Sequence, residues 1–483
     1  MTLISMTYEP SALARAFARL ADHEPWAPLV VSSSRRTTRG EVAALAQAGA
    51  RALEAAAGAP LVGFSAPNGP AFLAGVLALR QRGHGVLLLD PLAPLAERRR
   101  SCAALGARAM LSCTKGWPID AAEWVVAAIP DAMASSDAGD EVAFVKLTSG
   151  STGAPRGVAA TEAALLADDE ALARTMGLRA DDRILGAIPM SHSYGFSSVA
   201  LPALRRGSIA VVPEEDGPLA ALGAAAAAGA TVFPSAPAYL QALLKLSQPP
   251  SWPSSVRLVI SASAPLPSDV ASQFHARFGL PVHVFYGASE CGGICYDREG
   301  TAAERGTVGE PVEGVTVRLE APFGESEEGL VTVESPSVAL GYLPTGDPRL
   351  GGGRFVTSDL AVFEGSALRL RGRVDGLINV KGKKVNPTEI ESVLQRMPGV
   401  AEVVAFGVPS ADKASDTVRA VIACPGGGLG YDDVMAWCRA HLPEHKVPRS
   451  VVLVSAIPRT ARGKVSRAEL LALVGGRRGD PPA

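Results

Sequence analysis

The stretch Lys146-Leu147-Thr148-Ser149-Gly150-Ser151-Thr152-Gly153-Ala154-Pro155-Arg156-Gly157 decides the fold, because it holds three glycines, four hydroxyl residues and an arginine within twelve positions. Residues 142–147, which lead into it, are mostly apolar and β-branched or aromatic, and this predicts a buried strand. After the loop, Thr161 can cap an alanine- and leucine-rich helix that begins near Glu162. The order of strand, glycine-rich loop and helix is typical of a site that binds anions.

The residue types of this loop explain how it would hold an anion. Glycine lets the backbone approach a ligand, successive backbone N–H groups point inward, and hydroxyl groups add donors. Arg156 adds a positive charge that burial does not readily remove. The pattern Gly-x-x-x-x-Gly-Lys-Ser/Thr of the common nucleotide-hydrolase loop is absent. We expect a nucleoside triphosphate here, and a plain surface loop of small polar residues is the alternative.

Length and composition limit the class of protein. A chain of 483 residues, with 47% apolar and 19% charged residues, indicates a globular protein of two or three domains. The formal net charge of −2 gives no support for a nucleic-acid surface. None of the six cysteines forms a Cys-x-x-Cys pair, and the spacing of Cys291 and Cys295 disfavours a zinc site. Reduced thiols in a cytoplasmic protein are the expectation.

No targeting or membrane-spanning segment is predicted. Residues 1–10 carry Glu9 and lack a basic region before an apolar core, unlike a signal peptide. No apolar run approaches the roughly 18–20 residues that span a bilayer. The alanine-rich residues 220–230 are interpreted as a packed helix.

Helical and strand-like segments alternate through the first 300 residues, which predicts parallel sheets with crossover helices. The predicted helices cover residues 11–20, 39–57, 71–81 and 96–105, with a further one from 162. The predicted strands cover residues 61–64, 85–89, 109–112, 142–147, 184–188, 209–212, 231–233, 256–261 and 282–286.

The pattern changes after about residue 306. Short alternating segments separated by glycine and proline predict a small β-rich subdomain with strands at residues 315–319, 329–334, 355–358 and 368–370. Gly372-Arg373-Val374-Asp375-Gly376 is a turn and a candidate hinge. An α+β pattern follows, with helices at 387–395 and 431–442 and strands at 400–408, 418–424 and 450–453. We predict a large N-terminal α/β domain (1–371, with 306–371 β-rich), a hinge (372–376) and a small C-terminal domain (377–483).

Four further clusters of polar residues carry possible chemistry, each with a plainer interpretation. His192 follows a strand end, where a buried core histidine is the commoner outcome. Glu290, in Tyr286-Gly287-Ala288-Ser289-Glu290, would either cap a helix or bind a divalent ion. Asp359 is either a surface carboxylate or an acceptor for ribose hydroxyls. Residues 459–467 form a basic loop, for which a solvated surface is the usual role.

Their order and spacing resemble the acyl-adenylate-forming superfamily, which includes acyl-CoA synthetases, adenylation domains of peptide synthetases and beetle luciferases. The resemblance covers about residues 25 to 470. Its most specific matches are the loop from Thr148 to Gly157, the segment from Tyr286 to Glu290, the run from Gly372 to Glu391, and Arg459-Thr460-Ala461-Arg462-Gly463-Lys464. This family joins a carboxylic acid to ATP, releases pyrophosphate, and passes the acyl group to a thiol.

The resemblance implies a role for each matching residue. Thr148, Ser149, Gly150, Ser151, Thr152, Gly153 and Arg156 would grip the β- and γ-phosphates of ATP. Ser289 would bind the α-phosphate and Glu290 would hold Mg²⁺, while Tyr286 and Gly287 would lie at the adenine, with the backbone of 261–264 on its other face. Asp359 would accept the ribose hydroxyls, with support from Arg373.

The resemblance also implies a small, mobile C-terminal domain. Asp375 matches the hinge, and Lys464 would bridge the carboxylate and the α-phosphate during adenylation. After rotation, Lys381, Gly382 and Lys383 would line the tunnel for the thiol. Three departures from the family pattern matter, although none removes a step. Arg156 replaces lysine and keeps the charge with a different geometry, Ser289 replaces threonine and keeps the hydroxyl, and Val284 stands where some relatives place a polar contact to adenine, which must then come from the backbone.

The resemblance narrows the substrate. Amino-acid activators place an aspartate directly after the position of His192, where this chain has Ser193, so we expect an uncharged fatty or aryl acid. His192 would gate or position the acid, and the expected acyl pocket comprises Tyr194, Ser198, Phe233, Ser235, Ala262, Ser263, Gly287 and Ala288. These residues are mostly small and would leave room for a sizeable acid.

Alternatives remain for the thiol that accepts the acyl group and for the class of protein. CoA is the expected acceptor, and the phosphopantetheine arm of an acyl carrier protein is the alternative because it presents the same thiol. A non-catalytic nucleotide- or acyl-adenylate-binding protein and a luciferase-like oxygenase are rivals from other classes. The intact set Glu290, Asp359, Arg373 and Lys464 disfavours the binding protein.

Overall fold

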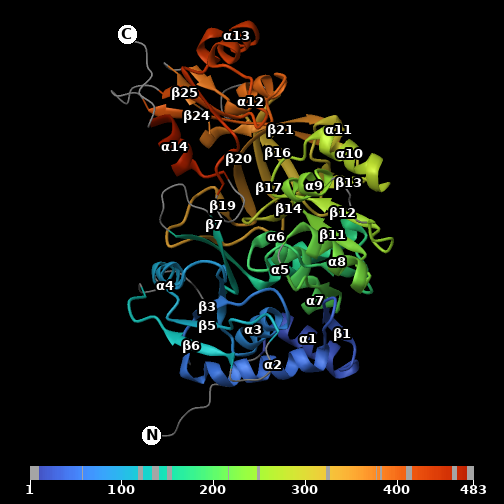
Figure 1. The fold of residues 1–483 in the computed structure, drawn as a ribbon. Coiled ribbons are helices and arrows are strands. Elements are labelled where there is room, and N and C mark those ends of the chain that lie inside the picture. The colour runs from blue at the N-terminus through green and yellow to red at the C-terminus, as the bar shows by residue number, and fades with distance from the viewer. Residues whose placement is uncertain are drawn as a thin grey trace. The chain divides into compact units, whose positions relative to one another are not determined.

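The fold is described from a computed structural model. It describes residues 10–56, 58–117, 123–132, 141–148, 155–215, 217–246, 251–321, 327–376, 378–380, 383–409, 416–459 and 465–475. The chain divides into two compact units (Figure 1). The first comprises Met1–Arg318, Thr332–Thr357 and Phe363–Arg369, and the second comprises Leu319–Val331, Ser358–Val362 and Leu370–Ala483.

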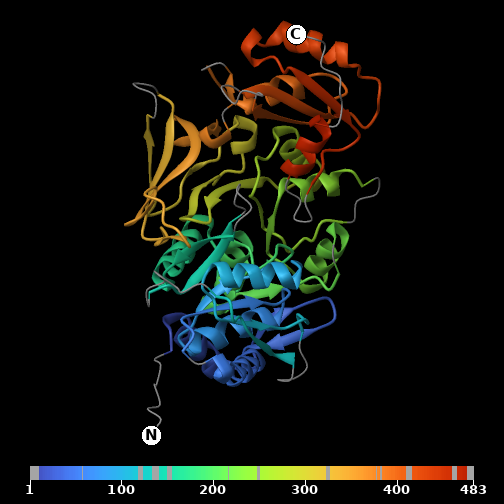
Figure 2. The ribbon, with the colours of Figure 1, turned by 90° about the vertical axis from the view of Figure 1, so that its left-hand side faces the viewer.

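A seven-stranded sheet forms the first half of the first unit. Its strand order is β18 (Gly341–Leu343), β8 (Arg156–Ala160), β7 (Phe144–Thr148), β4 (Gly85–Leu88), β3 (Leu61–Ser65), β5 (Ala109–Ser112) and β6 (Val125–Ala128). The strands β7, β4, β3 and β5 run parallel, while β8, β18 and β6 run antiparallel to their neighbours. Figure 2 shows β3, β4, β5 and β6 of this sheet in blue to cyan, near the N-terminal helices.

A nine-stranded sheet forms the other half of the first unit. Its order is β15 (Glu310–Pro311), β14 (Gly292–Tyr296), β13 (Val282–Ala288), β12 (Leu258–Ser261), β11 (Val232–Ser235), β9 (Arg183–Leu185), β10 (Ile209–Val211), β1 (Pro28–Val31) and β2 (Arg36–Thr38). The strands from β13 to β1 run parallel, and the strands at each end run antiparallel. The predicted parallel α/β fold is confirmed.

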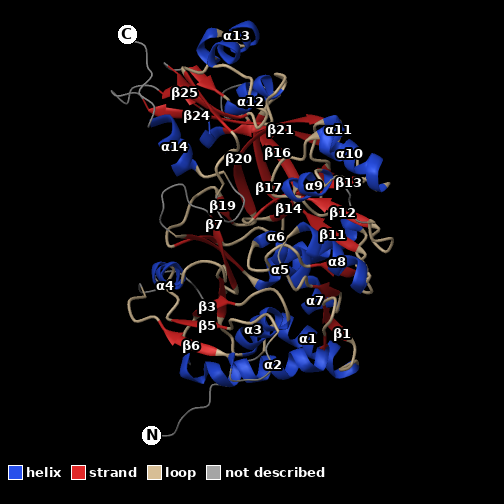
Figure 3. Cartoon of the chain, viewed as in Figure 1, coloured by secondary structure: helices blue, strands red, loops and turns tan. Residues whose placement is uncertain are grey.

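Helices connect these strands, and Figure 3 shows them in blue beside the red strands. In the first unit they are α1 (Ala12–His23), α2 (Arg39–Ala52), η1 (Leu53–Ala56), α3 (Pro70–Gln81), α4 (Leu95–Ala104), α5 (Glu162–Met176), α6 (Ser193–Gly195), η3 (Phe196–Ala200), α7 (Leu201–Arg206), α8 (Pro218–Ala228), α9 (Pro237–Leu244), α10 (Ser268–Phe278) and α11 (Ala302–Arg305). Their ends follow local chemistry. Thr161 accepts a hydrogen bond from the Ala164 N–H (3.0 Å), and Gly177 ends α5 in the left-handed region at φ +60°.

The main apolar core of the nine-stranded sheet is aromatic. Trp252 contacts the rings of Phe233, Phe274 and Phe278, with centroids 5.0–5.2 Å apart. Phe233 and Phe274 are fully buried, and such contacts contribute about 0.5–1.5 kcal/mol each beyond area burial. This core therefore fixes the strands whose ends carry the site.

A smaller β-rich region follows, as predicted. Strands β16 (Thr316–Glu320), β17 (Gly329–Glu334), β20 (Arg354–Glu364) and β19 (Leu350–Gly351) form one sheet in that order, and β21 (Ala367–Arg373) pairs with β20.

The second unit contains an α+β fold. Strands β24 (Glu402–Pro409), β25 (Asp416–Ala423) and β26 (Ser450–Val454) form its sheet, and β22 (Ile378–Val380) pairs with β23 (Lys383–Val385). Its helices are η4 (Val374–Gly376), α12 (Pro387–Gln395), α13 (Tyr431–His441), η5 (Glu444–Lys446) and α14 (Arg467–Gly475). Asn386 caps α12 by accepting from the Thr388 N–H (3.0 Å), and Pro387 occupies the first helical position.

The structure differs from the sequence prediction directly after the glycine-rich loop. Residues Arg156–Ala160 form β8, which pairs antiparallel with β7 on one side and with β18 on the other. The loop therefore joins a β-hairpin, while α5 begins at Glu162 as predicted. The dipole of a helix beginning at the loop is thus not available to an anion, because β8 separates the two.

Within the described residues, no helix is long and apolar enough to cross a bilayer.

Candidate active site

The candidate residues of the first unit gather at the carboxyl ends of parallel strands. Thr148 ends β7, and Ser235, Ser261 and Ala288 end β11, β12 and β13. Open α/β sheets bind ligands at this edge because the loops there converge from several strands. Thr148 belongs to the seven-stranded sheet, and Ser235, Ser261 and Ala288 belong to the nine-stranded sheet.

Glu290 lies just after β13 and is held by two neighbours. Its Oε1 accepts a hydrogen bond from the Tyr342 hydroxyl (2.8 Å), and its carbonyl oxygen accepts one from the Ala339 N–H (2.8 Å). Burial, followed by the adjacent Glu290 carboxylate, raises the pKa of Tyr342, so this phenol stays a proton donor. The carboxylate is therefore held in place before any ligand arrives.

Arg156 packs over the Tyr342 ring. Its guanidinium carbon lies 3.6 Å from the ring centroid, and its Nη2 forms an ion pair with Asp347 Oδ2 (3.1 Å). Hydrogen bonds from Arg349 and Arg156 hold the pKa of Asp347 well below its usual range. Arg156, Tyr342 and Glu290 thus form a connected row, which places the cation of the glycine-rich loop beside the carboxylate.

The glycine-rich loop itself is described only at its two ends. Thr148 Oγ1 donates to the Arg156 carbonyl oxygen (3.3 Å), which closes the hairpin. Ser149, Gly150, Ser151, Thr152 and Gly153 lie outside the described residues. Their role as phosphate ligands remains a prediction.

The donor set at Glu290 fits Mg²⁺ in the way that nucleotide enzymes use it. No group of three or more potential metal-binding side chains occurs among the described residues. Mg²⁺ commonly takes one or two carboxylates and completes its coordination with water and substrate phosphates. A single positioned carboxylate such as Glu290 suits this arrangement, and it does not suit a dedicated protein cage for zinc or calcium.

His192 lies in a turn that contacts the Glu290 segment. The turn, residues 189–195, includes α6 and leads into the π-helical η3. Ser193 Oγ lies 2.6 Å from Ser289 Oγ, and His192 Nε2 lies 3.8 Å from Asp90 Oδ2. The structure thus brings together Ser193 and Ser289, which are 96 residues apart in the sequence. We call residues 189–195 the acid turn, because the family resemblance implies that His192 gates or positions the acid.

Tyr194 extends from this turn into the interior. Its ring lies 5.9 Å from the Phe285 ring, and its buried hydroxyl finds no hydrogen-bond partner among the described residues. Burial raises the pKa of Tyr194, although the nearby Ser235 backbone opposes this effect. The phenol is therefore neutral, and its hydroxyl lies near the Ser235 backbone without a hydrogen bond of good geometry.

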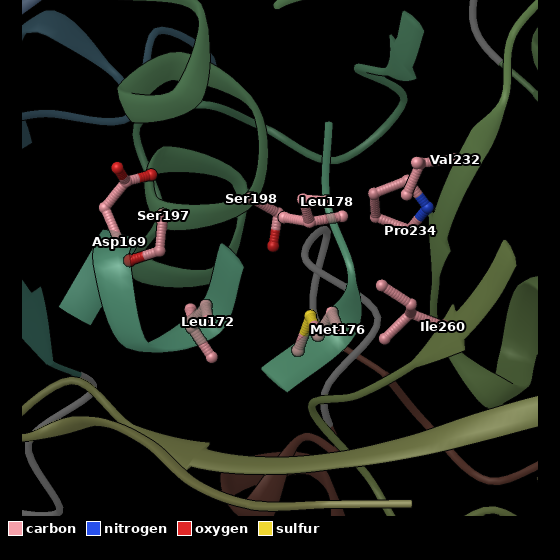
Figure 4. Close-up of a pocket in the computed structure, with 9 residues that line it drawn as sticks. All are labelled: Asp169, Leu172, Met176, Leu178, Ser197, Ser198, Val232, Pro234 and Ile260. Carbon is pink, nitrogen blue, oxygen red and sulfur yellow. The ribbon is translucent and has the colours of Figure 1, made fainter. Parts of the chain in front are cut away.

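A small cavity of about 10 Å³ lies against Ser197 and Ser198 of η3, which follow this turn in the sequence (Figure 4). It is enclosed by α5, η3 and the ends of β11 and β12, and its lining residues are Asp169, Leu172, Met176, Leu178, Ser197, Ser198, Val232, Pro234 and Ile260. Ser198 is the member of the predicted acyl pocket found in this lining. The cavity has room for about one water, so the structure does not show the sizeable space that the small residues suggested.

The other predicted pocket residues are not among those that line this cavity, and they differ in burial. Phe233 is fully buried in the aromatic core, against Tyr239 and Trp252, and does not line the cavity. Successive side chains of a strand point to opposite faces, so Val232 and Pro234 face the cavity while Phe233 faces the core. Ser235 is buried and donates to the Ile260 carbonyl oxygen (2.8 Å). Ala262 is buried, Ala288 is half-buried and Gly287 is exposed.

The segment after β12 carries backbone strain. Ser263 has φ +73° and is the non-glycine residue with positive φ among those described. This left-handed conformation costs a residue with a Cβ atom about 1–2 kcal/mol. Such strain persists where the surroundings dictate the backbone course, and Ser263 lies in the segment expected to face adenine.

Ser263→Gly is therefore expected to raise the free energy of unfolding by about 0.5–1 kcal/mol, because glycine adopts positive φ without a steric penalty. The measurement is denaturant unfolding of both proteins. Ser272→Gly, on the exposed face of α10, is the matched control and should lower stability by a similar amount. Destabilisation by Ser263→Gly would show that the serine side chain makes a compensating contact.

Two buried charges lie behind the site and were not foreseen from the sequence. Lys146, on β7, is buried, and the nearest acidic groups are Asp168 and Glu290. Burial lowers the pKa of Lys146 and raises that of Asp168. Asp168 accepts from the Gly293 N–H (2.9 Å) and from Ser197 Oγ (3.2 Å), so it ties the segment after Glu290 to η3. The position of Lys146 within a strongly apolar predicted strand was the sequence feature that could have indicated a buried charge.

In the second unit, Asp359 and Arg373 lie together. Arg373 Nη1 forms an ion pair with Asp359 Oδ1 at 3.2 Å. A cation next to the carboxylate is compatible with the predicted shared role at a ribose. Lys381, Gly382 and Lys464 lie outside the described residues, as do the side chains of Asp375 and Lys383. The hinge, thiol-tunnel and lysine roles therefore stay predictions.

Comparison with known proteins agrees with this arrangement. Residues 17–343 match the AMP-binding enzyme family, and residues 389–464 match the AMP-binding enzyme C-terminal domain. A feruloyl-CoA synthase from an Amycolatopsis species is 30% identical over 409 residues, covering 81% of this chain and 80% of the relative. A further relative, the oxalate–CoA ligase of Arabidopsis thaliana, is 29% identical over 350 residues, covering 68% of this chain and 66% of the relative.

Solved structures show the same architecture. ATP-bound MatB from Rhodopseudomonas palustris superposes with a TM-score of 0.80 at 25% identity, covering 95% of this chain and 98% of that protein. The o-succinylbenzoate-CoA synthetase MenE of Bacillus subtilis, at 22% identity and a TM-score of 0.79, shares the fold over 96% of this chain and 98% of that protein. The resemblance inferred from four sequence motifs is confirmed. The chain belongs to the AMP-binding enzyme family and is an AMP-forming acid–thiol ligase.

Proposed function

We propose that this enzyme activates an uncharged aryl or acyl carboxylic acid as its acyl-adenylate and transfers the acyl group to the thiol of CoA. The family relationship supplies ATP-dependent acid activation and thiol transfer. The choice of acid and of acceptor is the proposed part. The buried, unpartnered hydroxyl of Tyr194 beside the acid turn is the observation that carries it.

The charges around the acid turn argue against an amino-acid substrate. Ser193 occupies the position after His192, and its hydroxyl contacts Ser289. Asp169 lines the cavity, but its carboxylate is bound by Arg205 (2.8 Å) and Arg206 (2.6 Å). A substrate ammonium would therefore find its one acidic neighbour in the cavity lining already neutralised.

Adenylation joins two anions, so charge neutralisation and alignment matter more than proton transfer. The carboxylate oxygen attacks the α-phosphorus, and pyrophosphate leaves in line with that attack. The substrate acid is already ionised at pH 7, so this step needs no general base. Arg156 and Lys464 are the proposed cations, and Ser289 is the proposed hydrogen-bond donor to the α-phosphate. Mg²⁺, held by Glu290, would supply further positive charge at the phosphates.

The nucleotide is proposed to lie along the carboxyl ends of the strands. Thr148 and the loop after it would hold the leaving phosphates. Tyr286 would stack on the adenine, with the strained backbone at Ser263 on the opposite face. Asp359, supported by Arg373, would accept the ribose hydroxyls. The second step would transfer the acyl group from AMP to sulfur, with the thiol proton released.

The buried hydroxyl of Tyr194 favours a carboxylic acid that carries a further polar group over a purely aliphatic acid. A buried donor without a partner costs about 1–3 kcal/mol, and a hydroxyl or carbonyl group on the acid would remove that cost. A hydroxyaryl acid meets this requirement, and its ring can lie against Phe285. An unsubstituted alkyl chain leaves the phenol unpaired.

Tyr194→Phe is therefore expected to reduce kcat/KM about tenfold for a hydroxyaryl acid and to change it less than twofold for the aryl acid lacking the hydroxyl, since one hydrogen bond is worth about 1–1.5 kcal/mol. Pyrophosphate release measures both. Tyr239→Phe, whose hydroxyl bonds the Pro218 carbonyl away from the cavity, is the control. Equal losses with both acids would contradict a direct bond between Tyr194 and the substrate.

One experiment tests the proposed function as a whole. Pyrophosphate release is measured with hydroxyaryl, aryl, aliphatic and α-amino acids, each with CoA and with a phosphopantetheinylated carrier protein as acceptor. We expect the largest kcat/KM with a hydroxyaryl acid and CoA. Release with α-amino acids, or thioester formed on the carrier protein in preference to CoA, would contradict the proposal.

A further inference from the structure

Asn68 makes three hydrogen bonds to the backbone that leads into the acid turn. Its Nδ2 donates to the carbonyl oxygens of Gly186 and Ile188, both at 2.9 Å, and its Oδ1 accepts from the Met190 N–H at 2.8 Å. Each end of the carboxamide is used, and no carboxylate or aliphatic side chain offers this combination. The partners are 118–122 residues away in sequence.

A second contact reaches the same turn from the same sheet. Asp90 lies two residues after β4, its Oδ1 accepts from the Leu92 N–H (2.9 Å), and its Oδ2 lies 3.8 Å from His192 Nε2. The Asp90 side chain is 10% exposed, whereas that of His192 is 36% exposed. The aspartate is therefore the fixed member, and the imidazole is placed relative to it.

These contacts join the two sheets of the first unit at one place. Asn68 and Asp90 follow β3 and β4, which are adjacent parallel strands of the seven-stranded sheet. The acid turn follows β9, a central strand of the nine-stranded sheet. Residues at the ends of one sheet thus hold the substrate-facing turn of the other.

Two glycines allow the backbone to pack closely around Asn68. Gly69 has φ +141°, and a Cβ atom there would lie 2.5 Å from the Gly116 carbonyl oxygen. A Cβ atom at Gly116 would lie 2.4 Å from the Asn68 carbonyl oxygen. The two glycines let the Asn68 loop and residues near Gly116 approach closely, so Asn68 has little freedom to move.

We propose that Asn68 and Asp90 are positioning residues that fix the acid turn, with Asn68 setting its backbone and Asp90 orienting the His192 imidazole. The acid turn carries Ser193, which contacts Ser289, so a shift of the turn displaces the acid relative to the α-phosphate. This inference rests on the proposed function of the turn as the acid-binding segment.

The first test compares Asn68→Ala and Asn68→Asp with the wild-type enzyme. Both substitutions remove the two donors, and a misplacement of about 1 Å can cost about 100-fold in rate. We expect KM for the acid to rise about tenfold and kcat to fall, with KM for MgATP changing less than twofold. Equal changes in the two KM values, or unchanged acid KM in both variants, would overturn the proposal.

Asp90→Asn tests the second contact separately. It retains the acceptor for the Leu92 N–H and removes the charge that faces His192. We expect a smaller rise in acid KM, about threefold, and little added effect when it is combined with His192→Ala, because both changes remove one interaction. Fully additive effects of the two substitutions would refute the orienting role of Asp90.

A control separates positioning from general stability. Glu162 accepts from the Leu13 N–H (2.8 Å) and pairs with Arg80 (3.0 Å), and it does not contact the acid turn. Glu162→Gln should lower the unfolding temperature as much as Asn68→Ala does while leaving acid KM unchanged. An equal rise in acid KM would assign the Asn68 effect to stability and overturn the positioning role.

Hydrogen–deuterium exchange tests the positioning role of Asn68 without any enzymatic reaction, so the test does not depend on knowing the substrate. Hydrogen–deuterium exchange of residues 186–195 should be faster in Asn68→Ala, because the Met190 N–H loses its acceptor. If the wild-type enzyme activates none of the acids, the proposed function fails, while the exchange result still decides whether Asn68 holds the turn. If residues 186–195 exchanged at the same rate in Asn68→Ala and wild type, the proposal that Asn68 holds the acid turn would be overturned, whatever the activity.

Discussion

Glu290→Gln is expected to lower kcat/KM for MgATP about 100- to 1000-fold at limiting Mg²⁺, with a smaller loss at saturating Mg²⁺. The carboxamide keeps the size of the side chain and an acceptor for the Tyr342 hydroxyl, which bonds Oε1 at 2.8 Å. It loses the negative charge that a hard divalent cation requires. A positioned electrostatic group of this kind typically contributes about 3–4 kcal/mol to the transition state.

The measurement is pyrophosphate release over a range of Mg²⁺ concentrations. Glu304→Gln, an exposed residue of α11, is the control and should behave as wild type. Tyr342→Phe should have an intermediate effect, because it removes the hydrogen bond that holds the carboxylate and keeps the charge. If Glu290→Gln turned over normally at limiting Mg²⁺, the metal-ligand role would be excluded.

Lys464→Ala is expected to abolish acyl-adenylate formation, by at least about 1000-fold, and to leave thioester formation from a preformed acyl-adenylate within about threefold of wild type. The first step brings a carboxylate to a phosphate, and removing a cation there raises the barrier by several kcal/mol. The second step has a neutral thiol as reactant, and the family resemblance implies that Lys464 has by then left the site. This proposal concerns a residue outside the described part of the structure.

The two half-reactions are measured separately, by ATP–pyrophosphate exchange and by thioester yield from synthetic acyl-adenylate with CoA. Lys446→Ala is the matched control, because its ammonium bonds Glu389 within the second unit. Equal loss in both half-reactions would be incompatible with a lysine used in adenylation alone.

Most helices were predictable because their ends are encoded locally. Thr161 caps α5 three residues before its bonded N–H, and Asn386 with Pro387 begins α12 at the predicted residue. Strands were less predictable where pairing is non-local. The run Arg156–Ala160 is short and lacks alternation, and it becomes β8 because β7 and β18 flank it. Similarly, β20 extends through Ser358 and Asp359, which the sequence placed at a strand end.

The sequence motifs identified the candidate site residues, and the structure identified the residues that hydrogen-bond to them. Ser289, Glu290 and His192 stood out because they lie in recognisable segments. Tyr342 and Asp347 did not, since they are separated from Glu290 by 52 residues and from Arg156 by 191. Asn68 was missed for the same reason. A hydrogen bond between distant segments leaves no local pattern, so the structure is needed to find it.

The alternation of side chains along β11 has a consequence for how this enzyme's selectivity can diverge. Pro234 faces the cavity, while its neighbour Phe233 anchors the aromatic core, and on β12 Ile260 and Val259 are divided in the same way. Under the proposed function, substitutions at Pro234 and Ile260 would change the cavity without removing the packing of Phe233 and Val259 in the core. Acid preference and sheet stability would then depend on different positions, so single mutations could change the first and preserve the second.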